Sequence, residues 1–148
     1  MRKYLVLAVP IVLLGMQIHR PERTNPPADA GRAITAQMAV PEDVQRVLDR
    51  SCADCHSNRT VWPWYSHVAP LSWLLAGHVR EGREHLNFDD WPGTHKPAKL
   101  IDEICEEVEK GAMPLPGYVR LHSLAALSEG DKQLICGWTK SSAANLGK

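Results

Sequence analysis

Apolar residues recur at intervals of three and four along most of the chain, which is the pattern of helices with one buried face. This period predicts helices over residues 41–52, 71–86 and 97–111, and one that starts at Ser128. Their apolar stripes contain Val44, Val47 and Leu48 in the first helix, Leu100, Ile101, Ile104, Cys105 and Val108 in the third, and Leu134, Ile135 and Trp138 in the last. No alternating run is long enough to predict a strand, so we expect an all-α fold.

Residues with known positional preferences mark the helix ends. Pro41 suits a first helical position, and Gly111 suits the cap after the third helix. Ser128 and Asp131 have the spacing of an approximate capping box. Gly77 and Gly82 are expected to weaken the second helix, because glycine loses more backbone entropy in a helix than alanine does.

The N-terminus has the pattern of an export segment. Arg2 and Lys3 precede an uncharged apolar run over residues 4–18. We expect this run to anchor the chain in the inner membrane of a bacterium, with the remainder in the periplasm. Cleavage as a signal peptide, which would leave a soluble periplasmic protein, is the alternative, but the nearest A-x-A pattern, at residues 28–30, is rather far downstream. A buried core helix is a third reading.

The segment after the apolar run is rich in proline, arginine and small residues and has no clear period, so it is interpreted as a linker. We therefore predict a signal anchor or signal peptide over 1–19, a linker over 20–40 and one domain over 41–148. The 148 residues contain 17 basic and 17 acidic side chains, so no net charge points to nucleic acid.

The sequence CADCH at residues 52–56 carries the main chemical signal. Cys52 and Cys55 are spaced as in C-x-x-C-H, the pattern of covalent c-type haem, and the histidine that follows, His56, would bind the iron. A thioredoxin-like dithiol would need a βαβ context, and a zinc site would need two more ligands at matching spacing. Chance occurrence fits poorly with an export segment. We expect one haem c, attached through both cysteines.

Met113 is the candidate for the sixth iron position, because it lies in the loop GAMPLPGY after a predicted helix, where proline can hold a thioether in place. The alternative is that Met113 fills a gap in the core. His78 is conceivable as a ligand instead but is expected to be an ordinary helical histidine. The remaining domain histidines are not expected to bind iron; they are His67, His85, His95 and His122.

Five tryptophans and one phenylalanine make an unusual aromatic composition. The aromatic residues that follow CADCH are expected to wall the haem; they are Trp62, Trp64, Tyr65 and Trp73. Arg59 and Arg83 are candidates to pair with haem propionates, although an arginine is more often simply solvated. Ordinary aromatic core is the alternative for the tryptophans.

Cys105 and Cys136 leave two readings open. In an oxidising compartment they could bridge two helices. Cys136, however, lies off the apolar stripe of the last helix by helical spacing, which favours two small buried thiols. The acidic residues of the third helix are expected to form a solvated face, with a docking patch for a basic redox partner as the alternative.

Two longer stretches resemble the bacterial haem-binding domain family of small c-type cytochromes. The first is CADCHSNRTVWPWYSHVAPLSWLLAGHVREGREHLNF, and the second is GAMPLPGYVRLHSLAALSEGDKQLICGW. The matching positions of the later MP-Y-H-A-LS-W pattern are Met113, Pro114, Tyr118, His122, Ala126, Leu127, Ser128 and Trp138. The resemblance covers about residues 41 to 140. It implies covalent haem and supports Met113 as a ligand, but it implies neither a partner nor a reaction.

The sequence thus predicts a small single-haem cytochrome c-like helical domain behind an N-terminal hydrophobic segment. Its expected function is one-electron transfer with His56 and Met113 on the iron, as a carrier rather than an enzyme, to redox partner proteins in or near the membrane. A haem enzyme that reduces peroxide or another small oxidant, or a gas-binding sensor, is the alternative if the sixth position is open or labile.

Overall fold

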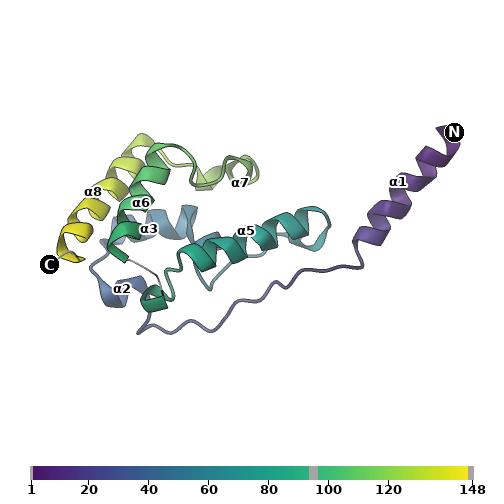
Figure 1. The fold of residues 1–148 in the computed structure, drawn as a ribbon. Helices are drawn as coiled ribbons and strands as arrows, with labels where there is room; N and C mark the ends of the chain where they lie inside the picture. Colours follow the sequence, from purple (N-terminus) through teal and green to yellow (C-terminus); the bar gives the residue numbers. More distant parts are fainter. Residues whose placement is uncertain (1, 94–96, 147–148) are drawn as a thin grey trace.

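A computed structural model describes residues 2–93 and 97–146 and shows an all-helical chain without strands in these ranges (Figure 1). The predicted all-α class is confirmed. His95 lies outside the described residues. The α-helices are α1 (Arg2–Met16), α2 (Ile34–Gln37), α3 (Glu42–Ser51), α4 (Ala53–His56), α5 (Leu71–His85), α6 (Pro97–Glu109), α7 (Pro116–Leu121) and α8 (Glu129–Leu146). Three short 3-10 helices join them, η1 (Trp64–His67), η2 (Trp91–Gly93) and η3 (Ser123–Ala125).

The long predicted helices correspond to α3, α5, α6 and α8, and their end signals act as expected. Gly111 has a positive φ of 70°. Its N–H bonds to the carbonyl of Val108 and that of Ala112 bonds to the carbonyl of Glu107, which is the Schellman arrangement. Ser128 and Asp131 exchange hydrogen bonds at the start of α8 and form the predicted capping box. Helix α5 continues through Gly77 and Gly82, so neither glycine interrupts it.

The core lies between α3, α6, α8 and the segment that follows α5. Its main cluster of buried apolar residues is Ile34, Val44, Leu48, Leu86, Phe88, Trp91, Ile101 and Trp138. Helices α6 and α8 lie side by side (Figure 1) and are joined by a disulfide between Cys105 and Cys136. The reading of two free thiols is therefore wrong. Helical spacing misled because the buried face of α8 is wider than the predicted stripe and includes Cys136, Thr139 and Ser142.

Residues 20–40, predicted as a linker, instead belong to the packed structure. Ile34 is only 2% exposed and lies in the main core cluster. Its N–H bonds to the Phe88 carbonyl, and the Trp91 N–H bonds to the Arg32 carbonyl. The prediction failed because this segment has no period of its own. Most of it docks through backbone and side-chain hydrogen bonds rather than through an apolar stripe.

We call residues 17–27 the strap, since this extended segment runs from α1 along the domain (Figure 1). Gln17 bonds twice to the backbone of Ala69, and the indole N–H of Trp73 donates to the His19 carbonyl at 2.8 Å. Further along, the strap bonds to Ser66, Arg83, Thr60 and Asn58. A flexible tether would not make these contacts.

Helix α1 stands apart from the domain in Figure 1 and contains Pro10. The described large apolar side chains from Val9 to Leu14 are exposed. Within residues 2–93 and 97–146, no helix has both the length and the apolar character needed to cross a membrane.

Candidate functional site

A cavity of about 470 Å³ opens beside the CADCH segment. Helices α4 and α5 line one side of it, while α6 and the loop after α6 line the other. Its apolar lining residues include Leu86, Phe88, Leu100, Ile104 and Val108. Cys52, Cys55, His56 and Met113 all line this one cavity, although 57 positions separate the last two in the chain.

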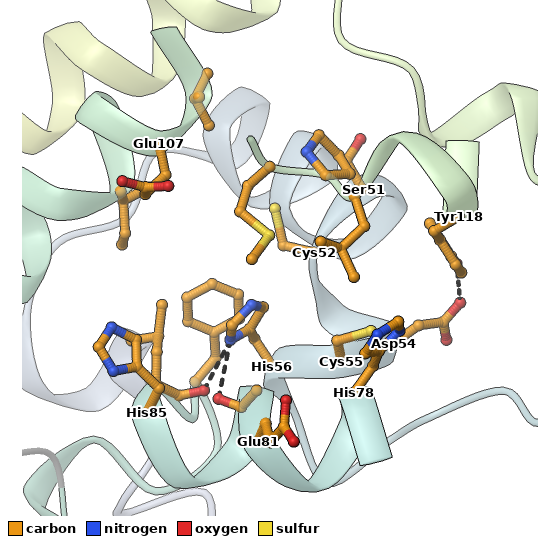
Figure 2. Close-up of a pocket in the computed structure, with 18 of the residues that line it drawn as sticks. Ser51, Cys52, Asp54, Cys55, His56, His78, Glu81, His85, Glu107 and Tyr118 are labelled. Atoms are coloured by element: carbon orange, nitrogen blue, oxygen red, sulfur yellow. Dashed lines mark hydrogen bonds between the residues drawn. The ribbon is translucent and has the colours of Figure 1, made fainter. Parts of the chain in front are cut away.

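Two backbone carbonyls hold the imidazole of His56 in one orientation. Its Nδ1 lies 3.1 Å from the carbonyl oxygen of Gly82 and 3.0 Å from that of Leu86, as the dashed lines in Figure 2 show. Carbonyl oxygens only accept hydrogen bonds, so Nδ1 must carry the proton and Nε2 keeps its lone pair. Burial lowers the pKa of His56 from its ordinary value. The ring is therefore a neutral imidazole with a free nitrogen, the form that binds metals.

Gly82 explains how α5 comes close enough to supply these carbonyls. A Cβ at this position would lie 2.7 Å from the carbonyl oxygen of Cys55, which is closer than real Cβ atoms come. The glycine that sequence analysis identified as a weak point of α5 thus allows α5 and α4 to touch.

Cys52 and Cys55 are both free thiols at the cavity. Burial raises the pKa of Cys52 to about 12 and that of Cys55 to about 11. Both groups are therefore neutral near pH 7, and neither has the lowered pKa of a reactive redox dithiol. This argues against the thioredoxin-like alternative.

Met113 reaches the cavity from a loop that is fixed at both ends. At its start, the Met113 N–H bonds to the Glu107 carbonyl at 3.1 Å, directly after the Schellman turn. At its end, the hydroxyl of Tyr118 donates a hydrogen bond to Asp54, which lies between the two cysteines (Figure 2). The two segments that carry His56 and Met113 are thus tied together beside the cavity.

The aromatic residues predicted to wall the haem do not line the cavity; they are Trp62, Trp64, Tyr65 and Trp73. The chain turns away after Asn58, so η1 packs beside the first turns of α5, whereas the cavity lies against its later turns. Trp62 and Tyr65 support Cys55 from behind, together with Leu75 and Val79. Trp64 is 78% exposed.

Arg83 and Arg59 are also placed elsewhere. The guanidinium of Arg83 donates to Ser57, Thr24, Asn25 and Thr60, so it binds the strap to the CADCH loop. Arg59 pairs with Asp89 at 3.1 Å. Neither arginine lines the cavity.

Sequence reasoning considered His78 as a ligand but did not predict that a whole face of α5 borders the cavity. His78, Glu81, Gly82 and His85 lie on one face of α5 that borders the cavity. Their spacing of three and four could have revealed that face. Tyr118 could not be found this way, because its partner Asp54 is 64 positions away in the chain.

The helical fold and this set of donors define a small haem protein. The chain belongs to the haem-binding domain family, whose sequence model matches residues 11–141. Searches of curated proteins and of solved structures gave no significant match. The site suits a haem, because a neutral imidazole, a methionine thioether and two neutral thiols surround one mainly apolar cavity.

Proposed function

We propose that this protein is a periplasmic single-haem c-type cytochrome that carries one electron at a time. Cys52 and Cys55 would attach haem c through thioether bonds, and His56 and Met113 would bind its iron. The observation that carries this proposal is the single cavity onto which all four side chains open, with the histidine and the methionine on segments that α4 and α6 position separately.

The chain's own residues set the properties of the carrier. The carbonyls of Gly82 and Leu86 orient His56, and their hydrogen bonds to Nδ1 raise the basicity of Nε2 as a ligand. With Met113 and His56 both as ligands, the thioether would favour reduced iron and raise the potential. The apolar walls from Leu86, Phe88 and Leu100 exclude water. When bound, the haem supplies an iron that alternates between the ferric and ferrous states.

Two features support the periplasm as the compartment. The disulfide between Cys105 and Cys136 is typical of an oxidising compartment such as the periplasm. The basic start and exposed apolar side chains of α1 fit a segment that directs export and anchors the chain in the inner membrane through residues 4–18. Removal of that segment as a signal peptide is the alternative. Redox proteins in or near the membrane are the proposed partners.

Spectroscopy of the matured protein tests the iron ligands. Wild type should be low-spin in both states, show a ferric sulfur-to-iron charge-transfer band and not bind CO. Met113→Ala should lose all three properties. Met38→Ala, which removes another partly buried methionine outside the cavity, is the matched control and should behave as wild type.

A different result would identify another function. If wild type is high-spin or binds CO at once, and Met113→Ala has the same spectra, Met113 is not a ligand and electron transfer as proposed is overturned. Peroxide turnover and gas binding would then be the functions to measure. Covalent attachment is tested separately, because haem should stay with the denatured wild type and be released from a Cys52→Ser/Cys55→Ser variant.

A further inference from the structure

The exposed apolar side chains of the domain are confined to one end of it. Beyond α1 and Ile18, the large exposed apolar residues of the described chain fall in two segments, 61–74 and 121–124. They are Val61, Trp64, Val68, Leu71, Leu74, Leu121 and Leu124, which we call the apolar end. Single exposed apolar residues are common, but their confinement to one end is a sign of an interaction surface.

The two segments adjoin in space. Tyr65 of η1 lies next to His122, with their ring centroids 5.9 Å apart and the Tyr65 hydroxyl 3.3 Å from Nε2 of the histidine. Trp64 and Leu121 flank these two residues in the chain. The apolar end is therefore one surface across η1, the start of α5, and α7.

The strap fixes this surface beside the end of α1. Gln17, the residue after α1, makes two side-chain hydrogen bonds to the backbone of Ala69, between Val68 and Leu71. Two residues later, the His19 carbonyl accepts from Trp73. Figure 1 shows the same relation, since the C-terminal end of α1 lies nearest to the end of the domain where α5 begins.

The charge pattern agrees with an anionic surface as the partner. None of the chain's 17 acidic residues lies in 61–80 or 110–128. These ranges contain Arg80 and Arg120, and the strap adds Arg20 and Arg23 together with one acid, Glu22. Basic residues around exposed tryptophan and leucine are typical of a surface that rests on anionic lipid.

We propose that the apolar end of the domain rests on the lipid bilayer, with Trp64, Leu71 and Leu74 in the interfacial region. This inference deepens the proposed function, because it relies on the membrane anchor. It also gives the strap a role, because the strap would orient the domain on the bilayer and would not act as a flexible linker. Gly82 lies about 16 Å along α5 from Leu71, at 1.5 Å per residue, so the site would be held at most that far above the lipid-contacting turn.

Lipid photocrosslinking of the full-length holoprotein tests the inference. The protein is reconstituted in vesicles of phosphatidylethanolamine and phosphatidylglycerol, with p-benzoylphenylalanine at one position in each variant. Trp64→p-benzoylphenylalanine and Leu74→p-benzoylphenylalanine should give lipid adducts. Glu106→p-benzoylphenylalanine and Lys140→p-benzoylphenylalanine, at exposed sites on α6 and α8, are matched controls and should give none. An unchanged haem absorption spectrum shows that each variant is folded.

Carbonate extraction of the same vesicles without irradiation tests the membrane anchor separately from the lipid-facing surface. Retention of the protein in the membrane fraction, with lipid adducts at positions 64 and 74, supports both the anchor and the lipid-facing surface. Retention with no adduct at these positions, or with adducts to protein alone, overturns the lipid-facing surface while the anchor stands. Release of the non-irradiated protein by carbonate, together with lipid adducts at 64 and 74 in separately irradiated samples, overturns the anchor and leaves the apolar end as a peripheral lipid-binding surface. Release without adducts overturns both.

Discussion

Gly82 of α5 touches Cys55 of α4 so closely that a Cβ on the glycine would lie 2.7 Å from the cysteine's carbonyl oxygen. Gly82→Ala should therefore push α5 away from α4 and pull the carbonyl of residue 82 from His56. Overpacking of this kind costs about 1–3 kcal/mol, so we expect a lower free energy of unfolding and less covalent haem per protein. Urea unfolding and haem staining of the denatured protein measure the two effects.

Gly77→Ala is the matched control for this prediction. Gly77 lies in the same helix, and a Cβ there would meet nothing within 4 Å. Alanine at an open helical position is favoured over glycine by about 0.5–1 kcal/mol, so Gly77→Ala should be neutral or stabilising. If both variants had the same stability and haem content, the contact between α4 and α5 would not matter for the site.

Tyr118 connects the loop that carries Met113 to Asp54 in the CADCH segment. Tyr118→Phe removes only the hydroxyl and should cost about 1–3 kcal/mol, the range for loss of a hydrogen bond to a buried or charged partner. Because the loop is then held at one end only, Met113 should leave the iron more easily, so Tyr118→Phe should bind CO where wild type does not, which absorbance after CO addition would show.

Tyr65→Phe provides the same chemical change outside the cavity. The Tyr65 hydroxyl meets His122 rather than Asp54, so its loss should leave the protein unable to bind CO, as in wild type. Failure of Tyr118→Phe to bind CO would mean that the bond to Asp54 does not hold the methionine loop.

Local signals in the sequence predicted the helices and their caps, because periodicity, Gly111 and the Ser128–Asp131 pair act within a few residues of the chain. The CADCH motif is local in the same sense. The errors concern relations across the chain. Whether Cys136 can reach Cys105 depends on how α8 packs on α6, and the role of Arg83 depends on a strap almost 60 residues earlier. No repeating pattern encodes either relation.

Arg83 should be necessary for docking of the strap. Its guanidinium donates to four acceptors, whereas a lysine ammonium has three protons on one nitrogen and cannot reproduce that fork. Arg83→Lys should therefore loosen the strap and speed tryptic cleavage after Arg23, with the haem absorption spectrum unchanged. Peptide mapping over time gives the rates.

Arg80→Lys is the control for charge and position, since Arg80 is an exposed neighbour on α5 whose pair with Glu84 spans 3.9 Å. Trypsin should cleave the strap of the Arg80→Lys variant as slowly as that of wild type. A changed haem absorption spectrum in Arg83→Lys would contradict a purely structural role for Arg83 and support its pairing with a haem propionate.

Asp131 should make the stability of the domain depend on pH in the acidic range. Hydrogen bonding from the Ser128 backbone lowers the pKa of Asp131 from its ordinary value. A lowered pKa in the folded state gives stability that is present above the ordinary carboxyl range and is lost as pH falls through the folded pKa. Asp131→Ala should cost about 1 kcal/mol at neutral pH, as loss of a helix cap does, and less at low pH.

Asp102→Ala, at an exposed position of α6, is the comparison for Asp131→Ala and should show little change at either pH. Thermal unfolding followed by circular dichroism between neutral and acidic pH gives the two curves. Parallel curves for wild type and Asp131→Ala would show that the capping box does not titrate with folding.

The disulfide should contribute more to stability than any single contact discussed above. Cys105 and Cys136 are 31 positions apart, and closing a loop of that length in the unfolded chain stabilises a fold by about 3–4 kcal/mol. Cys105→Ala/Cys136→Ala should lower the free energy of unfolding in urea by that amount. Because neither sulfur lines the cavity, the haem absorption spectrum of the folded variant should match that of wild type.

Dithiothreitol should destabilise wild type to the level of the variant and leave the variant unchanged, because thioether bonds to haem are not reduced. If dithiothreitol destabilised both proteins equally, the effect would lie outside this bridge.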